Sequence, residues 1–195
     1  MVEQIRRIPE FIIFTGPMFG SKTTKLLAAL DRFRYQNRNI LAFKPKMDER
    51  YSFSEICTHG GGKIQAIVVD RGQDILDIVE KSESEIDIVA VDEAFMIEGC
   101  AESLLTLFRE GKTIVVSSLQ LSATGNVFEE IRDMMPWATK IEICPAVCTV
   151  SGLDAYYTHR KFQNMDEITV GGSDIYEPRS WFHHSFMNFK REEER

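Results

Sequence analysis

The sequence predicts an α/β fold in which a mainly parallel sheet is flanked by helices. Three observations lead to this prediction. Short apolar runs alternate with amphipathic segments over residues 1–143, which is the order typical of parallel sheets. The first apolar run is followed by a glycine-containing turn and a Lys-Thr pair. A later apolar run ends in two adjacent carboxylates, Asp92 and Glu93.

Six runs rich in apolar residues are expected to form strands. They cover Phe11–Thr15, 39–44, 63–69, 86–91, 112–119 and Lys140–Ile143. Apolar residues at helical spacing predict helices over 24–34, 74–81, 101–109 and 127–135, the last of them ended by Pro136. The polar, glycine-containing stretch 45–62 is expected to be a loop that can order over a ligand.

The turn after the first strand has the layout of a phosphate-binding loop. It consists of Gly16, Pro17, Met18, Phe19, Gly20, Ser21, Lys22 and Thr23. Backbone N–H groups and the positive end of the following helix would cradle phosphate oxygens. Lys22 would reach the β- and γ-phosphates, and the Thr23 hydroxyl would hold Mg²⁺. An ordinary strand–turn–helix corner is the alternative, which the two carboxylates of the later strand disfavour.

One position departs from the usual phosphate-loop pattern. The general motif has glycine directly before the lysine, whereas this chain has Ser21 and carries its glycine one place earlier, at Gly20. If the position before the lysine needs a positive φ, serine has a conformational cost that glycine avoids.

Two carboxylates follow the strand expected at 86–91. The carboxyl ends of parallel strands line the ligand crevice of such sheets, so Asp92 would face the Mg²⁺ of a nucleotide held by the first loop. Glu93 would be free to act as a general base on a substrate hydroxyl. A strand end that turns into solvent is the alternative, and the Lys22–Thr23 loop makes it the poorer one. Together the two motifs predict a P-loop fold that binds a nucleoside triphosphate.

Composition limits the class of protein. The 195 residues allow one α/β domain with a small appendage, and a hydrophobic content of 44% is enough for a core. A net charge of −7 disfavours a nonspecific nucleic-acid binder. No apolar run reaches the roughly 20 residues of a membrane helix, and the first ten residues lack the apolar core of a signal peptide. Because the four cysteines are too scattered for a disulfide scaffold, we expect a soluble protein of a reducing cytoplasm.

The composition and the hydrophobic pattern of the sequence change at Cys144. Beyond this residue the segments are short, aromatic residues are more frequent, and no clear helix is predicted. We therefore expect an ATP-binding α/β domain at 1–143, a small second domain at 144–189, and a solvated charged tail at 190–195.

Several motifs, taken in order, resemble the type II thymidine kinase family. Residues 16–23 resemble its first loop, Gly-Pro-Met-Phe-x-Gly-Lys-Ser/Thr. Residues 44–51, 57–59 and 92–94 resemble its Lys-Pro-x-x-Asp-x-Arg-Tyr, Cys-Thr-His and Asp-Glu-Ala motifs. Residues 146–148, 157–160 and 170–176 match its C-terminal segment in order and spacing. The resemblance covers nearly the whole chain, and the ordered set is highly specific.

The resemblance implies a P-loop fold with a small zinc-ribbon-like lasso domain, and ATP:Mg²⁺-dependent phosphorylation of the 5′-hydroxyl of thymidine. Glu93 would accept the hydroxyl proton, Asp48 and Arg50 would lie near the phosphates and metal, and Asp92 would be the second acidic partner of Mg²⁺. The residues expected around the nucleoside are Met18, Met96, Phe128, Thr158, Glu167, Ile168, Thr169, Val170, Gly171 and Tyr176. Residues 167–171 would be the lasso that grips the base, and the family implies a homo-oligomer, commonly a tetramer.

Departures from the family pattern gather around the base. The family's glutamine after Asp-Glu-Ala is Phe95, and its following phenylalanine is Met96. Its Leu-Asp-Gly motif reads Leu-Gln-Leu at 119–121, and a substrate-lining aromatic falls on Ala123. Strict thymidine specificity therefore stays open, and deoxyuridine or a modified pyrimidine deoxynucleoside is the other acceptor class.

The zinc ligands that the family implies are also altered. Alignment through the C-terminal motifs places Cys148, Ser151, Ser180 and His183 at the four ligand positions. Serine is a poor zinc ligand and structural sites use four Cys or His residues, so zinc is expected to be lost. A shifted ligand set stays open, formed by Cys144, Cys148, His183 and His184.

A metal-free small domain would have to be held by packing. We expect a small core of the cysteines with Trp181 and Phe182. The further candidates for packing the lasso are Tyr156, Tyr157, Phe162 and Phe186.

Two other functions stay open beside the kinase. A P-loop ATPase or nucleotide switch with a decayed nucleoside pocket would account for Ser21, Phe95 and Gln120. A partner-binding relative without catalysis is disfavoured by the retained Lys22 and Glu93.

Overall fold

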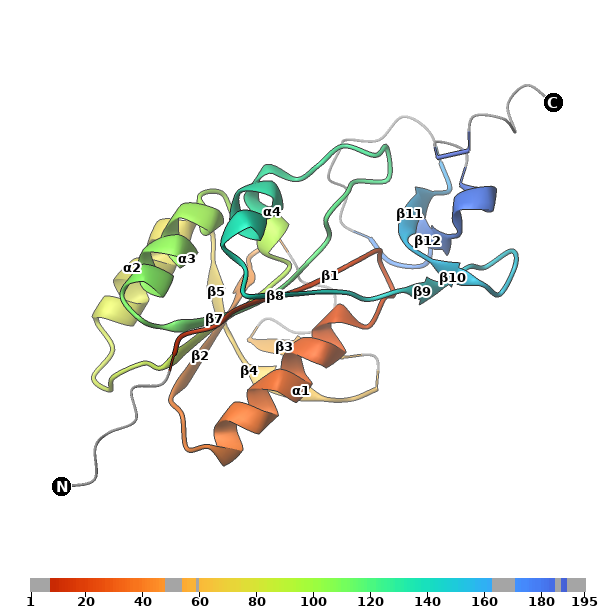
Figure 1. The fold of residues 1–195 in the computed structure, drawn as a ribbon. Helices are drawn as coiled ribbons and strands as arrows, with labels where there is room; N and C mark the ends of the chain where they lie inside the picture. Colours follow the sequence, from red (N-terminus) through yellow and green to blue (C-terminus); the bar gives the residue numbers. More distant parts are fainter. Residues whose placement is uncertain (1–7, 48–53, 59, 163–170, 185–186, 189–195) are drawn as a thin grey trace.

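A computed structural model describes residues 8–47, 54–58, 60–162, 171–184 and 187–188 (Figure 1). Within these residues six strands form one sheet in the order β5-β2-β6-β7-β1-β8, and each neighbouring pair runs parallel. The strands are β1 (Phe11–Thr15), β2 (Ile40–Pro45), β5 (Ile67–Val69), β6 (Ile88–Asp92), β7 (Thr113–Ser118) and β8 (Lys140–Ile143). The predicted α/β class with a mainly parallel sheet is confirmed.

The central strands owe their position to their sequences. Every residue of β1, β6 and β7 is buried, as expected for near-continuous apolar runs covered on both faces. Along β1 the side chains alternate between the two faces. Phe11 and Ile13 join one core cluster, whereas Ile12 and Phe14 join the other.

Helices cover both faces of the sheet (Figure 1). One face carries α1 (Lys22–Tyr35) and the antiparallel hairpin of β3 (Glu55–Cys57) and β4 (Lys63–Gln65). The other face carries α2 (Gly72–Glu80), α3 (Cys100–Arg109) and α4 (Glu129–Met134). No helix in the described part of the chain is long and apolar enough to cross a lipid bilayer.

The segment from 45 to 69 differs from the expectation. The predicted loop 45–62 contains β3, and the predicted strand 63–69 is two strands that belong to different sheets. β4 pairs with β3, whereas β5 joins the edge of the main sheet beside β2. Alternating apolar residues identify extended chain but not its pairing partner, so the break between Gln65 and Ile67 could not be found from the pattern.

The ends of two helices also differ from the expectation. α1 begins two residues earlier, at Lys22, so the lysine of the phosphate-binding loop belongs to the first helical turn. α4 ends at Met134, and the chain continues through a 3₁₀ turn, η2 (Met135–Trp137). Proline is tolerated there because the first turn of a helix does not use its N–H group.

The C-terminal part forms a small lobe of two antiparallel hairpins (Figure 1). The first pairs β9 (Ala146–Val147) with β10 (Asp154–Ala155), and the second pairs β11 (Tyr157–Arg160) with β12 (Tyr176–Arg179). A 3₁₀ turn, η3 (Trp181–His183), follows β12.

The expected aromatic core of this lobe is wrong for four of the five aromatic side chains that the structure describes. The fifth, Tyr157, is half-buried, and its ring centroid lies 5.8 Å from that of His184. Trp181 and Phe182 are 47% and 63% exposed, and Tyr156 and Phe162 also lie at the surface. The buried cluster instead consists of Ala146, Cys148 and Ala155, with Phe19 of the phosphate-binding loop packed against it. Small side chains let the two strands of the first hairpin lie close to the loop. Phe186, the remaining candidate, lies outside the described residues.

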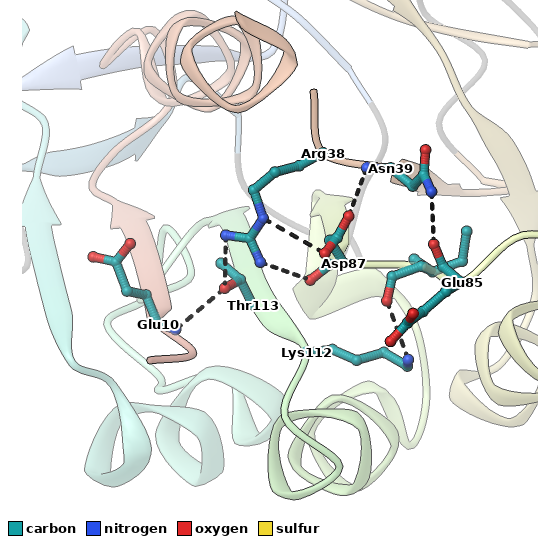
Figure 2. Close-up of polar contacts among 8 residues, drawn as sticks. Glu10, Arg38, Asn39, Glu85, Asp87, Lys112 and Thr113 are labelled. Atoms are coloured by element: carbon teal, nitrogen blue, oxygen red, sulfur yellow. Dashed lines mark hydrogen bonds and ion pairs between the residues drawn. The ribbon is translucent and has the colours of Figure 1, made fainter. Parts of the chain in front are cut away.

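A polar network ties together the amino ends of the central strands (Figure 2). The side chain of Arg38, only 8% exposed, donates to the Thr113 hydroxyl and to the Asp87 backbone carbonyl, each at 3.5 Å. Asp87 in turn accepts from the Asn39 backbone N–H at 2.9 Å, and the Glu10 N–H donates to Thr113. The guanidinium also lies over the Phe33 ring, 5.4 Å from its centroid. One arginine therefore connects α1, β2, β6 and β7.

We expect Arg38→Leu to lower the free energy of unfolding by about 1–3 kcal/mol, because it removes charged hydrogen bonds to Thr113 and Asp87 and the contact with Phe33. Arg34→Leu is the matched control, since Arg34 makes only an exposed i,i+3 pair with Asp31. This control should lose less than about 0.5 kcal/mol. Urea unfolding of both variants measures the difference, and equal losses would contradict the assigned role of Arg38.

Candidate active site

The loop between β1 and α1 packs directly on the end of β8. A Cβ atom added at Gly16 or Gly20 would lie 2.4 Å from the backbone oxygen of Cys144. Gly16 also has φ +136°, a conformation that other residues rarely adopt. Both glycines are therefore required by contact with Cys144, and the loop is held close to the carboxyl edge of the sheet.

Two residues of the loop adopt left-handed backbone conformations without being glycine. Phe19 has φ 66° and Ser21 has φ 58°. The positive φ expected at the position before the lysine is thus present, although this chain places serine there. The adjacent Lys22 side chain is buried, and its Nζ donates to the Pro17 carbonyl at 2.6 Å. The lysine ammonium therefore lies against the loop that it follows.

The carboxylate of Asp92 joins the loop to the sheet. Thr23 Oγ1, in the first turn of α1, lies 3.2 Å from Asp92 Oδ1. The hydroxyl of Ser117, on the neighbouring strand β7, also donates to Asp92 Oδ1. Asp92 is buried, so these hydroxyls supply bonds that an enclosed carboxylate needs. The structure thus brings together two residues that were each predicted to hold Mg²⁺.

Glu93 follows directly and turns the chain away from the sheet. Its backbone is left-handed, with φ 49° and ψ 44°, and it leads into the 3₁₀ turn η1 (Ala94–Met96). Such a conformation costs an L-residue about 1–2 kcal/mol and gathers at functional sites. The turn directs Glu93 to the cavity that Lys22, Thr23 and Asp92 also line.

This cavity has a volume of about 260 Å³. Its walls come from four parts of the chain: the phosphate-binding loop, the end of β6, the β3–β4 hairpin and the lobe. The lining residues are Met18, Phe19, Gly20, Ser21, Lys22, Thr23, Thr24, Cys57, Thr58, Gly60, Asp92, Glu93 and Gly172. Residues with cationic, hydroxyl and carboxylate side chains thus line one cavity.

A chain of hydrogen bonds connects the lobe to the loop. The Met18 backbone N–H donates to Thr158 Oγ1 at 3.0 Å, so Thr158 of β11 contacts the phosphate-binding loop. His184 Nε2 lies 2.9 Å from the Thr158 carbonyl. Because a carbonyl only accepts, Nε2 carries the proton. Burial lowers the pKa of His184, the hydrogen bond to Thr158 opposes this shift, and the neutral ring is a fixed donor.

The structure brings together only part of the predicted site. Residues 18–23, Asp92 and Glu93 line the cavity, and Thr158 is joined to them through Met18. Asp48, Arg50 and residues 167–170 lie outside the described residues. Gly171 and Tyr176 belong to the lobe but do not line the cavity, whereas Gly172 does.

Met96 and Phe128 also do not line the cavity. Both pack against the core cluster beside α3 and α4. The ring of Phe128 lies 4.4 Å from that of Phe95, centroid to centroid. The residue that replaces the family's glutamine is therefore buried in the core beside its aromatic neighbour.

Several residues of the cavity were missed from the sequence. Thr58 and Gly60 come from the β3–β4 hairpin, where a loop was expected, although Cys57 and Thr58 belong to a motif that the resemblance had identified. Ser117 does not line the cavity but bonds to Asp92. It too was missed, because a serine in a buried strand reveals its partner only when the neighbouring strand is known.

We expect Ser21→Gly to raise the free energy of unfolding by about 0.5–1 kcal/mol. A left-handed conformation costs serine about 1–2 kcal/mol, and the greater freedom of glycine in the unfolded chain offsets roughly 0.5–1 kcal/mol of the gain. Ser21→Ala is the control and should bring no gain, because alanine has the same conformational cost. The measurement is urea unfolding, and equal stability of the two variants would show that the backbone strain at residue 21 is negligible.

Comparison with known proteins assigns the chain to a family. A family model described as thymidine kinase matches residues 10–184. The thymidine kinase of Pyrobaculum aerophilum is 31% identical over 179 residues, which cover 89% of this chain and 97% of the relative. That of Thermococcus kodakarensis is 32% identical over 182 residues, covering 88% and 92%, and that of Bacteroides thetaiotaomicron is 28% identical over 178 residues, covering 91% and 87%. The loop, the acid-tipped strand and these matches agree that the chain belongs to the thymidine kinase family.

Proposed function

We propose that this protein is a thymidine kinase that transfers the γ-phosphate of ATP to the 5′-hydroxyl of thymidine. One observation carries the proposal. The Glu93 carboxylate lines the same cavity as the lysine and threonine of the phosphate-binding loop and the Asp92 that Thr23 contacts. A phosphate cradle and a carboxylate base in one cavity are the parts that phosphoryl transfer to an alcohol requires.

The donor groups beside the loop fit Mg²⁺. Thr23 and Asp92 offer a hydroxyl and a carboxylate at the edge of the cavity, and Mg²⁺ prefers such oxygen ligands together with substrate phosphates. We assign Thr23 and Asp92 as its protein partners, with Asp48 beside them. When bound with ATP, Mg²⁺ neutralises charge on the phosphate oxygens.

The loop binds and orients the triphosphate. The backbone N–H groups of residues 16–23 and the amino end of α1 attract phosphate oxygens. The Lys22 ammonium, which donates to the Pro17 carbonyl at the start of the loop, would exchange this acceptor for β- and γ-phosphate oxygens. Arg50 would add a second positive charge at the transferring group.

Glu93 is the proposed general base. Its carboxylate takes the proton of the 5′-hydroxyl while that oxygen forms a bond to the γ-phosphorus, and the bond from phosphorus to the bridging oxygen of ADP breaks. Proton transfer to a positioned group contributes roughly 10²–10⁴-fold to such rates. The left-handed backbone at residue 93 turns the chain away from β6, and the residue lines the cavity, which supports this assignment.

The lobe is proposed to grip the nucleoside. Met18 and Thr158, which are joined by a hydrogen bond, would lie near the base. The other residues assigned to this pocket are Met96, Phe128, Tyr176, Gly171 and residues 167–170. A pyrimidine deoxynucleoside is the proposed acceptor, with thymidine first and deoxyuridine second.

The proposed function also divides the chain into domains. The ATP-binding domain covers residues 1–143, the lobe covers 144–189 and the charged tail covers 190–195.

Glu93→Gln should lower kcat for thymidine by about 10²–10⁴-fold and leave ATP binding unchanged, because the amide keeps the shape but cannot accept the proton. Glu98→Gln is the matched control, since Glu98 lies in the following turn with its side chain 85% exposed. Both variants are assayed with labelled MgATP, and ATP binding is measured by calorimetry. Full activity of the Glu93 variant would refute its role as base.

The same assay distinguishes the competing function. Thymidine, deoxyuridine, deoxycytidine and the two purine deoxynucleosides are offered in parallel. No product with any of them, together with intact ATP binding, would establish a P-loop ATP-binding protein with a decayed nucleoside pocket. Product with deoxyuridine alone would keep the kinase and change the acceptor.

We also propose that the protein is a cytoplasmic homo-oligomer. β8 is an edge strand of the main sheet, with β1 as its neighbour there. Ile141 and Ile143 on this edge are 45% and 52% exposed, and exposed apolar edge strands favour pairing with another chain. All four cysteines are free thiols, which suits a reducing compartment.

Light scattering after gel filtration should therefore give a mass of two or more chains for the native protein. Ile141→Lys/Ile143→Lys should shift this mass downward, because charged side chains on an edge oppose pairing. Val127→Lys is the control, as Val127 is exposed to a similar degree away from β8. A monomeric native protein would contradict the oligomer, and an unchanged mass of the double variant would place the interface elsewhere.

A further inference from the structure

The four positions aligned with zinc ligands converge in the structure. Cys148 and Ser151 lie in the turn of the first lobe hairpin, which is closed by bonds from the Cys148 N–H to the Leu153 carbonyl at 2.8 Å and from the Gly152 N–H to the Cys148 carbonyl at 2.9 Å. Ser180 and His183 lie at the η3 turn that follows β12. Both Cys148 and Ser180 are almost fully buried. We name this group the CSSH cluster.

Hydrogen bonds lie within each half of the CSSH cluster. In the first turn, Ser151 Oγ accepts from the Leu153 backbone N–H at 3.4 Å. Ser180 Oγ lies 3.0 Å from His183 Nδ1. Cys148 is buried as well, so two hydrogen-bonded serine hydroxyls stand at positions where a metal site would have ligands.

Two further contacts fasten the two turns together. The Thr149 N–H donates to the Pro178 carbonyl at 3.2 Å, and its hydroxyl donates to Glu177 Oε2 at 3.1 Å. The first turn is thereby held on β12, beside the start of η3. The CSSH cluster is closed by this packing on one side and by its own hydrogen bonds on the other.

The donor set does not fit structural zinc. Such sites use four Cys or His ligands, and the CSSH cluster has one of each. The described residues hold no group of three or more His, Cys, Asp or Glu side chains arranged to bind a metal. His184 does not complete the set either, because the described residues hold no such group that joins it with Cys148 and His183. Cys144 is also unsuited, since it lies at the end of β8 beneath the phosphate-binding loop.

We propose that the hydrogen-bonded CSSH cluster closes the lobe in place of a zinc ion, so that folding of the lobe and its grip on the loop are independent of metal. The cluster stands at the position of a metal site but is held by the hydrogen bonds of two hydroxyls and by the packing of its two turns. Ser151 and Ser180 are the two positions at which the cluster lacks a zinc ligand. Replacing both with cysteine would place three sulfurs and one imidazole around the same point.

The native protein gives the first test. It is expressed in medium supplemented with zinc, purified without chelator, and analysed by plasma mass spectrometry. We expect less than about 0.1 zinc ion per chain and a thermal midpoint that EDTA leaves unchanged, because no metal contributes to folding. About one zinc ion per chain, or a midpoint lowered by EDTA, would overturn the proposal.

Ser151→Cys/Ser180→Cys gives the second test. With Cys148 and His183 it should bind about one zinc ion per chain, show the intense visible absorption of tetrahedral cobalt–thiolate when loaded with Co²⁺, and become sensitive to EDTA. The control Ser151→Ala/Ser180→Ala removes both hydroxyls without adding ligands. It should bind no zinc and melt below the native protein, whereas Ser173→Ala, an exposed change on the same lobe, should not.

None of these measurements depends on kinase activity. A failure of the proposal on the CSSH cluster is therefore distinguishable from a failure of the proposed kinase function. A folded double-cysteine variant that takes up neither metal would show that the four positions do not converge. An alanine pair with an unchanged midpoint would show that the hydrogen bonds do not hold the lobe. If the double-cysteine variant does not fold, the metal content of the native protein and the alanine pair still decide.

Discussion

Satisfying one enclosed charge organises the catalytic end of the sheet. The Asp92 carboxylate ends β6 in a place where an unpartnered charge would be costly, and hydroxyls from β7 and α1 bond to it. These contacts fix the first turn of α1 relative to the strands, and therefore fix the loop that precedes it. They also determine where the next residue, Glu93, leaves the sheet. Phosphate binding and the proposed base are thus positioned by one carboxylate.

Backbone strain is concentrated at the same place. Among the described residues, positive φ outside glycine occurs at Phe19, Ser21, Asn37 and Glu93, and three of these four line the cavity. Strained conformations persist only where the surrounding structure determines them. The packing of both glycines on Cys144 and the hydroxyl bonds to Asp92 supply that support. Packing and hydrogen bonds in the rest of the sheet therefore hold the site residues in backbone conformations that isolated segments would avoid.

Much of the fold could be predicted because its signals are local. Continuous apolar runs identified the central strands, and the Lys-Thr pair after β1 identified the loop before any partner was known. Several features that depend on a tertiary partner were mispredicted or missed. Residues 63–69 divide between two sheets, Ser117 bonds across strands, and Trp181 and Phe182 lie at the surface while alanines fill the lobe. The many aromatic residues of segment 144–189 gave no indication that little space remains between the hairpins and the phosphate-binding loop.

The contact between the loop and Cys144 also limits how this protein can change over time. Its backbone oxygen leaves no room for a side chain at Gly16 or Gly20, so a slip of β8 by one residue would alter the floor of the loop. The contact uses the backbone of residue 144 and not its side chain, so it constrains the two glycines and the path of β8 rather than the residue type at 144. The last strand of the main sheet and the first loop, which lie far apart in the chain, can therefore change only together.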